Sequence, residues 1–303
     1  MLRSLLSTFF FCTICLPAWA QPPGGPSEGT ATDLLAAGQA AFSRKDFSLA
    51  VRSLQSLCAR YKDSNECRQG KLTLGTAHFL TSQYAEAAAV LESLPCPQSR
   101  AAEVLHMLSS SYIYLGRIDD AQRALGSLYD LPPDSPEARL LTARMMVRLE
   151  RETEALQALS ELAGRTPPLP SANYFLGILH LGRSEFDQAI TAFRREIRYN
   201  PTLSDAQYKL GDALGRKQKW IEAIPHLQMS IWLNPDQSGP YVILGKAYLN
   251  TENLQNAEAM LRRALEIDPN NSAAAYSLAQ ALRRAGRASE ATVLFERVRK
   301  QSQ

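Results

Sequence analysis

The sequence predicts an all-helical chain built from one repeated unit. The main observation is a small residue, usually preceded by an apolar one, that recurs first after 37 residues and then at six intervals of 34. An alanine stands twelve residues after each copy, and a leucine or phenylalanine stands four residues further on. Self-similarity at a fixed period of this length is typical of repeat architectures. The recurring small residues are Gly38, Gly75, Ser109, Ala143, Gly177, Gly211, Gly245 and Ala279.

Each repeat is numbered here so that this small residue is position 8. Apolar residues at positions 7, 11, 24 and 27 or 28 are three or four apart within each segment, which is the spacing of a buried helix stripe. Small residues at positions 8 and 20 let two helices approach closely, where a larger side chain would overpack the contact. Repeats three to seven carry a proline at position 32, and proline cannot continue the helical hydrogen-bond ladder. We therefore predict that the second helix ends at Pro133, Pro167, Pro201, Pro235 and Pro269.

The pattern resembles the tetratricopeptide repeat family, whose 34-residue unit is a pair of antiparallel helices. The match is clearest in Leu176-Gly177, Phe186, Ala189, Phe193 and Pro201, and the next copy repeats it as Leu210-Gly211, Trp220, Ala223, Leu227 and Pro235. The resemblance implies a right-handed α-solenoid over residues 31–303. Its repeats are expected at 31–67, 68–101, 102–135, 136–169, 170–203, 204–237, 238–271 and 272–303.

Repeat four departs most from the family pattern. It has Thr142 at position 7 and Glu152 where an aromatic residue is usual, and no repeat has tryptophan at position 4. The resemblance predicts the fold more sharply than the function, because one scaffold of this kind hosts many ligands.

The first twenty residues have the layout of a cleavable secretory signal. Arg3 precedes an apolar run from Leu5 to Leu16, and the triplet Ala18-Trp19-Ala20 follows, so cleavage is expected after Ala20. The run is shorter than the roughly 20 residues that span a bilayer; an uncleaved N-terminal anchor is the alternative interpretation. Residues 21–30 are rich in proline and glycine and are expected to form a short leader. The predicted location is therefore periplasmic or extracellular.

Three cysteines remain after the expected cleavage, namely Cys58, Cys67 and Cys96. The extra residues of the first repeat interval lie between Cys58 and Cys67, and an exported chain folds where such a pair can oxidise. We predict a Cys58–Cys67 disulfide that leaves Cys96 free. Pairing of Cys67 with Cys96 is the alternative, and three buried thiols are expected if the chain is not exported.

Composition argues against several classes of function. The chain has 33 Lys and Arg against 30 Asp and Glu, a net charge of +3, which gives little support to nucleic-acid binding. No second apolar run of membrane-spanning length follows the signal. The 4 histidines and 5 cysteines are scattered, and no phosphate-binding loop, HExxH or nucleophile-elbow motif occurs. We therefore expect no metal, no cofactor and no enzymatic activity.

The resemblance implies that the first helix of each repeat lines a concave groove, through positions 2, 5, 6, 9, 12 and 13. Tyrosines flanked by Arg and Lys at these positions could hold an extended peptide by stacking and charge-assisted hydrogen bonds. Alternatively, tyrosine at position 5 is simply common in such repeats. The candidate binding residues are Tyr174, Tyr208, Lys209, Arg216, Lys246, Asn250, Tyr276 and Arg283.

The predicted function is thus that of an exported, non-enzymatic scaffold that binds a protein or peptide in its groove. The basic character of the candidate residues favours an acidic segment as the ligand. The alternative is a structural or assembly subunit of a cell-envelope complex, with contacts through the convex face or the C-terminal end.

Overall fold

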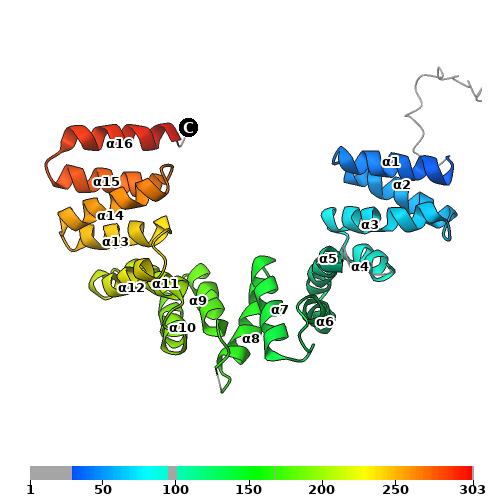
Figure 1. The fold of residues 1–303 in the computed structure, drawn as a ribbon, viewed down its shortest axis with the longest axis horizontal. Helices are drawn as coiled ribbons and strands as arrows, with labels where there is room; N and C mark the ends of the chain where they lie inside the picture. The colour runs from blue at the N-terminus through cyan, green and yellow to red at the C-terminus, as the bar shows by residue number, and fades with distance from the viewer. Residues whose placement is uncertain (1–28, 95–100, 167, 302–303) are drawn as a thin grey trace, which may run out of the picture. The chain divides into compact units, whose positions relative to one another are not determined.

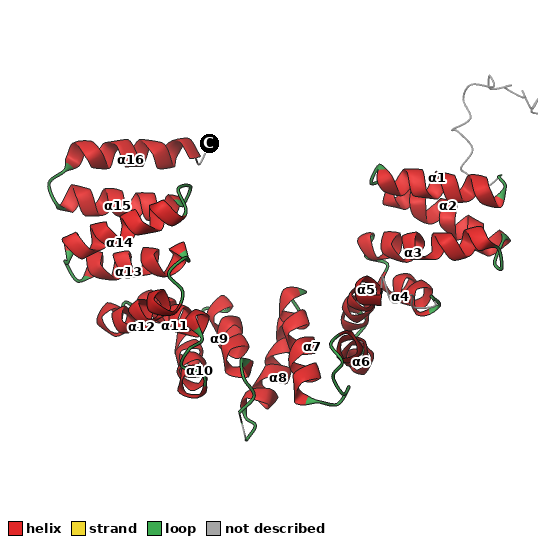
Figure 2. Ribbon diagram, viewed as in Figure 1, coloured by secondary structure: helices red, strands yellow, loops and turns green. Residues whose placement is uncertain are grey.

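The computed structural model describes residues 29–94, 101–166 and 168–301, which form sixteen helices and no strand (Figure 2). The prediction of an all-α chain is confirmed. The first helices of the pairs, called A helices, are α1 (Ala31–Ser43), α3 (Asn65–Leu80), α5 (Ala101–Tyr114), α7 (Pro136–Arg148), α9 (Ala172–Gly182), α11 (Ser204–Arg216), α13 (Ser238–Asn250) and α15 (Ser272–Arg284). The second helices, called B helices, are α2 (Phe47–Arg60), α4 (Tyr84–Glu92), α6 (Ile118–Leu128), α8 (Glu152–Ala163), α10 (Phe186–Tyr199), α12 (Trp220–Leu233), α14 (Leu254–Ile267) and α16 (Ala288–Gln301).

Consecutive helices pack side by side as antiparallel neighbours from α1 to α5 and again from α6 to α16 (Figure 1). The contacts divide the chain into two compact units that meet in sequence between Gly116 and Arg117, inside the predicted third repeat. The predicted signal, residues 1–20, and all but the last two residues of the leader lie outside the described residues. No helix of the described part is both long and apolar enough to cross a membrane.

The contact between the helices of one pair is closest where position 8 meets position 24. A Cβ atom added at Gly211 would lie 2.5 Å from Cγ of Leu227, and the same distance separates Gly38 from Leu54 and Gly245 from Leu261. Such distances are shorter than van der Waals contact, so only glycine allows this approach. The alanines at position 20 are also buried, each at most 2% exposed. The repeating small residues therefore mark the seam of each pair, as the sequence predicts.

The turn inside each pair contains a left-handed residue that could not be predicted from the sequence. Position 15 has a positive φ in all eight repeats, but only Gly116 and Gly286 are glycines there. The other six residues are Lys45, Ser82, Glu150, Ser184, Gln218 and Glu252. A residue with a Cβ in the left-handed region costs about 1–2 kcal/mol. The packing of the two helices therefore imposes this turn geometry against the local preference of six side chains.

The link between repeats varies in length. Helices α10, α12 and α14 end two residues before their prolines, as predicted. Helices α6 and α8 end earlier, at Leu128 and Ala163, so for these two the proline does not set the end. After α6 the chain turns back because the carbonyl of Gly126 accepts the amides of Tyr129 and Leu131. The link between α8 and α9 is correspondingly long, at residues 164–171.

Candidate functional site

The A helices form the inner layer of the second unit. The backbone of α9 contacts that of α11, α11 contacts α13, and α13 contacts α15, whereas no two B helices approach each other so closely in the described part of the chain. A stack whose A helices are closer together than its B helices curves toward the A layer. The exposed side of α7, α9, α11, α13 and α15 is called the inner face, and all eight candidate binding residues belong to these helices.

Tyr174 is held in place by an unusual cap at the start of α9. The N-cap residue Ser171 has a φ of 67° and makes no side-chain cap. Glu196 of α10, only 2% exposed, takes over this role: its carboxylate accepts the amides of Ser171 at 2.8 Å and Tyr174 at 3.3 Å. A carboxylate at a helix N-terminus is favoured by the helix dipole. Glu196 is the only acidic residue at position 27 in the eight repeats, which is the sequence signal for it.

The rings of Tyr174 and Tyr208 are half-buried rather than free in the groove. Tyr174 stacks edge-on against Phe175, and Tyr208 packs so closely on the next repeat that a Cβ at Gly239 would lie 2.8 Å from its hydroxyl oxygen. Burial raises the pKa of both phenols above the usual value, with nearby aspartates adding to the effect. Tyr208 thus joins successive A helices, and both tyrosines offer only part of their surface to a ligand.

Tyr276 is different, with 49% of its surface exposed. Its ring meets Phe295 of α16 edge-on with centroids 5.5 Å apart, and the guanidinium of Arg283 lies 5.8 Å from the Phe295 centroid. No following repeat covers this position within the described residues. Tyr276, Phe295 and Arg283 therefore form an accessible aromatic and cationic cluster at the end of the inner face.

The polar candidates differ in whether their side chains already contact other groups of the chain. Arg216 is paired with Asp212 of its own helix, at 3.3 Å. The ammonium of Lys209 lies 4.8 Å from the centroid of the Tyr208 ring. The side-chain amide of Asn250 donates to the carbonyl of Lys246, whereas the Lys246 ammonium makes no ion pair with any described residue. Lys246 is therefore the candidate most available to an anionic ligand.

The eight candidates do not include the apolar residues that lie between these charges, which we call the apolar floor. Phe175, Ile178 and Ile243 are partly buried at positions 6 and 9 of their A helices, and the guanidinium of Arg144 lies 4.7 Å from the Phe175 centroid. The groove positions of the repeat already contain these residues, and their apolar character is the signal for them. The inner face thus combines apolar surface with cations on either side of it.

Charge is distributed unequally between the two layers of the second unit. Seven exposed or partly exposed cations lie on the inner face, and within the described residues only Arg216 is in an ion pair. On the B helices and the turns, by contrast, most such cations face a carboxylate, as in Arg194–Glu222, Lys217–Asp187 and Arg262–Glu258. The seven inner-face cations are Arg144, Arg148, Lys209, Arg216, Lys246, Arg283 and Arg284.

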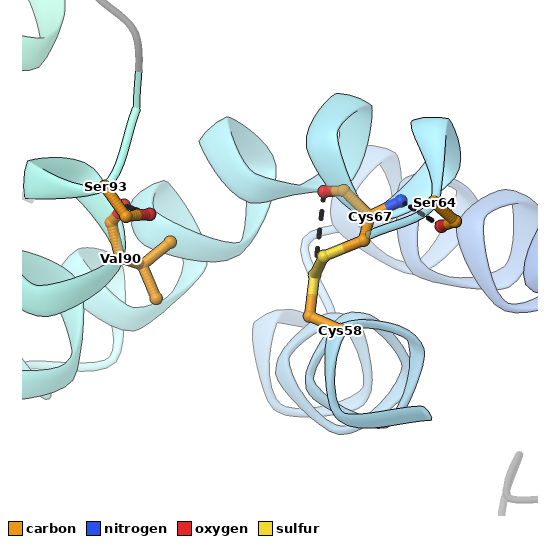
Figure 3. Close-up of a disulfide and its surroundings, with 5 residues drawn as sticks. All are labelled: Cys58, Ser64, Cys67, Val90 and Ser93. Atoms are coloured by element: carbon orange, nitrogen blue, oxygen red, sulfur yellow. Dashed lines mark hydrogen bonds between the residues drawn. A yellow bond between two sulfur atoms is a disulfide. The ribbon is translucent and has the colours of Figure 1, made fainter. Parts of the chain in front are cut away.

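The first unit contains a disulfide between Cys58 of α2 and Cys67 of α3, with Cα atoms 5.0 Å apart (Figure 3). Cys67 is fully buried, and its amide donates to the hydroxyl of Ser64, the N-cap of α3. The bond therefore connects the end of one repeat to the first turn of the next. Cys96, the partner in the alternative pairing, lies outside the described residues.

Open space borders repeat four and the start of repeat five. An opening of about 360 Å³ lies where Thr142 stands in place of the usual leucine. Two others, of about 340 and 430 Å³, border Asn173 of the next repeat. No group of three or more His, Cys, Asp or Glu side chains in the described part of the chain is arranged to hold a metal ion.

Family models for the tetratricopeptide repeat match residues 35–102, 106–170, 174–238 and 248–303, most of the chain. This is a tetratricopeptide repeat protein. The sixteen helices described above agree with about eight such repeats. No curated protein sequence matches the chain significantly.

Solved structures of other repeat proteins share the fold. MamA (residues 41 to the end) from Desulfovibrio magneticus RS-1 is 23% identical with a TM-score of 0.52, over 56% of this chain and 96% of that one. YrrB, described as a repeat protein with an unusual peptide-binding site, is 18% identical with a TM-score of 0.50, over 55% of this chain and 86% of that one. At these identities the similarity concerns the fold.

Proposed function

We propose that this repeat protein is a non-enzymatic scaffold whose inner face binds an acidic, extended segment of a partner protein. The observation that carries the proposal is the set of inner-face cations, of which only Arg216 has a carboxylate partner in the described part of the chain. A folded chain rarely gathers like charges without compensation, because they repel one another. An acidic ligand removes that repulsion.

The apolar floor supplies the other half of the recognition. Apolar side chains of the ligand would lie on Phe175, Ile178 and Ile243, while its carboxylates would reach Arg148 and Lys246 on either side. Charge-assisted hydrogen bonds orient such a segment, and desolvated apolar contacts provide most of the affinity. The peptide-binding site named for YrrB supports this use of the fold.

Selection of random dodecapeptides on phage tests this proposal. We expect the selected peptides to be enriched in Asp and Glu next to apolar residues. Reversal of the free charge in Lys246→Glu should weaken a selected peptide at least about tenfold, since a charge-assisted hydrogen bond is worth roughly 1.5–3 kcal/mol. Lys246 is a better site for this test than Tyr208, whose truncation would also disturb packing against Gly239.

Arg52→Glu is the matched control, because Arg52 is exposed on the B helix α2 and makes no ion pair with a described residue. Its affinity for the selected peptide should equal that of the unmodified chain. Equal affinity of Lys246→Glu, or selection of peptides without acidic residues, would contradict the proposal.

A second candidate function is assembly through the outer face or the C-terminal end. One observation favours it, namely large apolar side chains that stand exposed on the outer side of α12, with Ile221 and Trp232 each more than three-quarters exposed.

We also propose that the chain is exported and cleaved after Ala20. The signal-like sequence of residues 1–20 supports this, and so does the Cys58–Cys67 disulfide, because disulfides persist in oxidising compartments. The chain isolated from its native source should begin at Gln21 and be found in the periplasmic or extracellular fraction. An intact Met1 on a cytoplasmic chain would contradict export, and an intact Met1 on a membrane fraction would indicate the anchor.

A further inference from the structure

Helix α12 carries a continuous apolar stripe on its outward side. Ile221, Pro225, Met229 and Trp232 follow one another at intervals of four, four and three residues, which places them on one face of a helix. Their exposure is high, at 79% for Ile221, 43% for Met229 and 77% for Trp232. Exposed apolar residues scattered singly are ordinary, but a contiguous group of this kind marks an interaction site.

The stripe is not part of the repeat pattern. The same four positions, 18, 22, 26 and 29, are Asp187, Thr191, Arg195 and Arg198 in the preceding B helix α10. In the following B helix α14 they are Gln255, Ala259, Arg263 and Glu266. Pro225 also stands inside α12, where proline removes a helical hydrogen bond at a cost of about 3 kcal/mol. The repeat framework therefore does not account for these side chains.

Ion pairs border the stripe and argue against a membrane as its occupant. Glu222, which is exposed on α12 itself, is paired with Arg194 of α10 at 2.8 Å. On the other side, Arg263 of α14 is paired with Glu266 at 2.9 Å. An anionic lipid surface attracts lysine and arginine and repels carboxylates. Arg195 and Arg198 of α10 have no such partner among the described residues, but the carboxylates of Asp187, Glu222 and Glu266 stand among these cations. The surface around the stripe therefore has mixed charge, which suits a protein better than a membrane.

We propose that α12 pairs with α12 of a second copy of this chain, antiparallel and about a two-fold axis. An isologous interface requires a surface that is complementary to itself. The stripe meets this requirement, because an antiparallel pairing places Ile221 opposite Trp232 of the second copy and Pro225 opposite Met229. The bulky tryptophan thus meets a medium-sized side chain, and the methionine meets the compact proline.

The flanking charges agree with the same axis. It places α10 opposite α10, so Asp187 approaches Arg198 of the second copy, and the symmetry makes this attractive pair twice. Asp187 already contacts Lys217, but its side chain is 76% exposed, and Arg198 makes no ion pair with a described residue. The α14 helices, which also lie opposite each other, bring no two like charges together. A parallel pairing would also make an attractive contact, between Arg198 of α10 and Glu266 of α14, but it would place Arg195 opposite Arg263. The antiparallel pairing avoids this repulsive contact.

The size of the contact sets the expected affinity. A helix of 14 residues such as α12 is about 21 Å long, too short to bury the roughly 800 Å² per partner of a standard stable interface. The dimer is therefore weak and depends on concentration. It uses the B layer and leaves the inner face open, so it is independent of the proposed peptide binding.

Sedimentation equilibrium of the mature chain from about 1 to 200 μM tests the proposal. A monomer–dimer equilibrium is expected, and Trp232→Glu should lower the association constant at least tenfold. Val293→Glu is the matched control, because Val293 is 67% exposed at position 22 of the last B helix α16. It should leave the constant unchanged, and circular dichroism should show equal helix content in all variants.

A charge exchange tests the arrangement itself. Arg198→Glu should weaken the dimer, and the double variant Arg198→Glu with Asp187→Arg should restore it, because the antiparallel pairing puts these two side chains opposite each other. A double variant as weak as Arg198→Glu alone would overturn the antiparallel arrangement.

Two other results would overturn the dimer as a whole. One is a chain that stays monomeric at about 200 μM. If such a monomer sediments together with phosphatidylglycerol vesicles, the stripe binds a membrane instead. The other is a dimer that Trp232→Glu does not weaken, because the contact would then lie elsewhere on the chain.

Discussion

Replacement of Gly211 by valine is expected to lower the free energy of unfolding by about 3 kcal/mol. The first atom of the new side chain would lie 2.5 Å from Cγ of Leu227, which is fully buried and cannot swing away. Either α11 and α12 must separate, or Leu227 must leave its rotamer. Urea unfolding followed by circular dichroism measures the change, as a lower midpoint at constant slope.

Gly182→Ala is the matched control for this substitution. Gly182 is also helical, but a Cβ there would meet nothing within 4 Å. Alanine should therefore stabilise the chain slightly, by about 0.5–1 kcal/mol, through the unfolded state. A double-mutant cycle of Gly211→Ala with Leu227→Ala should show strong coupling, because removal of the leucine creates the space that the new methyl group needs. Equal loss from Gly211→Val and Gly182→Ala would contradict the packing assigned to position 8.

Removal of the Cys58–Cys67 disulfide is expected to cost about 2–3 kcal/mol. The two cysteines are 9 residues apart, so the bond closes a short loop in the unfolded chain and stabilises mainly by restricting that loop. The double variant Cys58→Ala with Cys67→Ala removes both partners, so that neither is left as a new unpaired thiol, and it should unfold at lower temperature than the oxidised chain. A reductant should lower the unfolding temperature of the unmodified chain and leave the double variant unchanged.

Cys96→Ser distinguishes this pairing from the alternative. If Cys67 pairs with Cys58, the Cys96→Ser chain keeps both its stability and its response to reductant. A loss of stability in Cys96→Ser as large as that in the double variant would show that Cys67 pairs with Cys96 instead.

The architecture of this protein could be predicted from the sequence because the same pattern of small and apolar residues recurs in each repeat. Position 20 is alanine in every copy and is buried in every copy, and position 8 meets position 24 wherever glycine stands there. Because the pattern occurs in all eight repeats, it does not arise by chance, and the helix pairs can be predicted without a structure. The early ends of α6 and α8 were not predictable in this way, because they depend on how single links turn back on themselves.

The candidate site was predictable in place but not in detail. Tyr174, Tyr208 and Tyr276 all stand at the same groove position of their repeats, so the sequence does not distinguish them. In the structure the first two are half-buried and the third is exposed. The difference arises from the following repeat, whose Gly239 lets it close over Tyr208. Local sequence around a tyrosine does not show what the next helix pair covers.

The sequence by itself determined the helix pairs, the buried alanines and the basic character of the A helices, because these follow from period and residue type. Only the tertiary structure decided which charges remain without partners and which apolar residues face outward. Lys246 lacks a carboxylate within the described residues, whereas Arg194 has one from the next B helix. Such pairings join residues almost a full repeat apart, and stacking rather than local sequence brings them together.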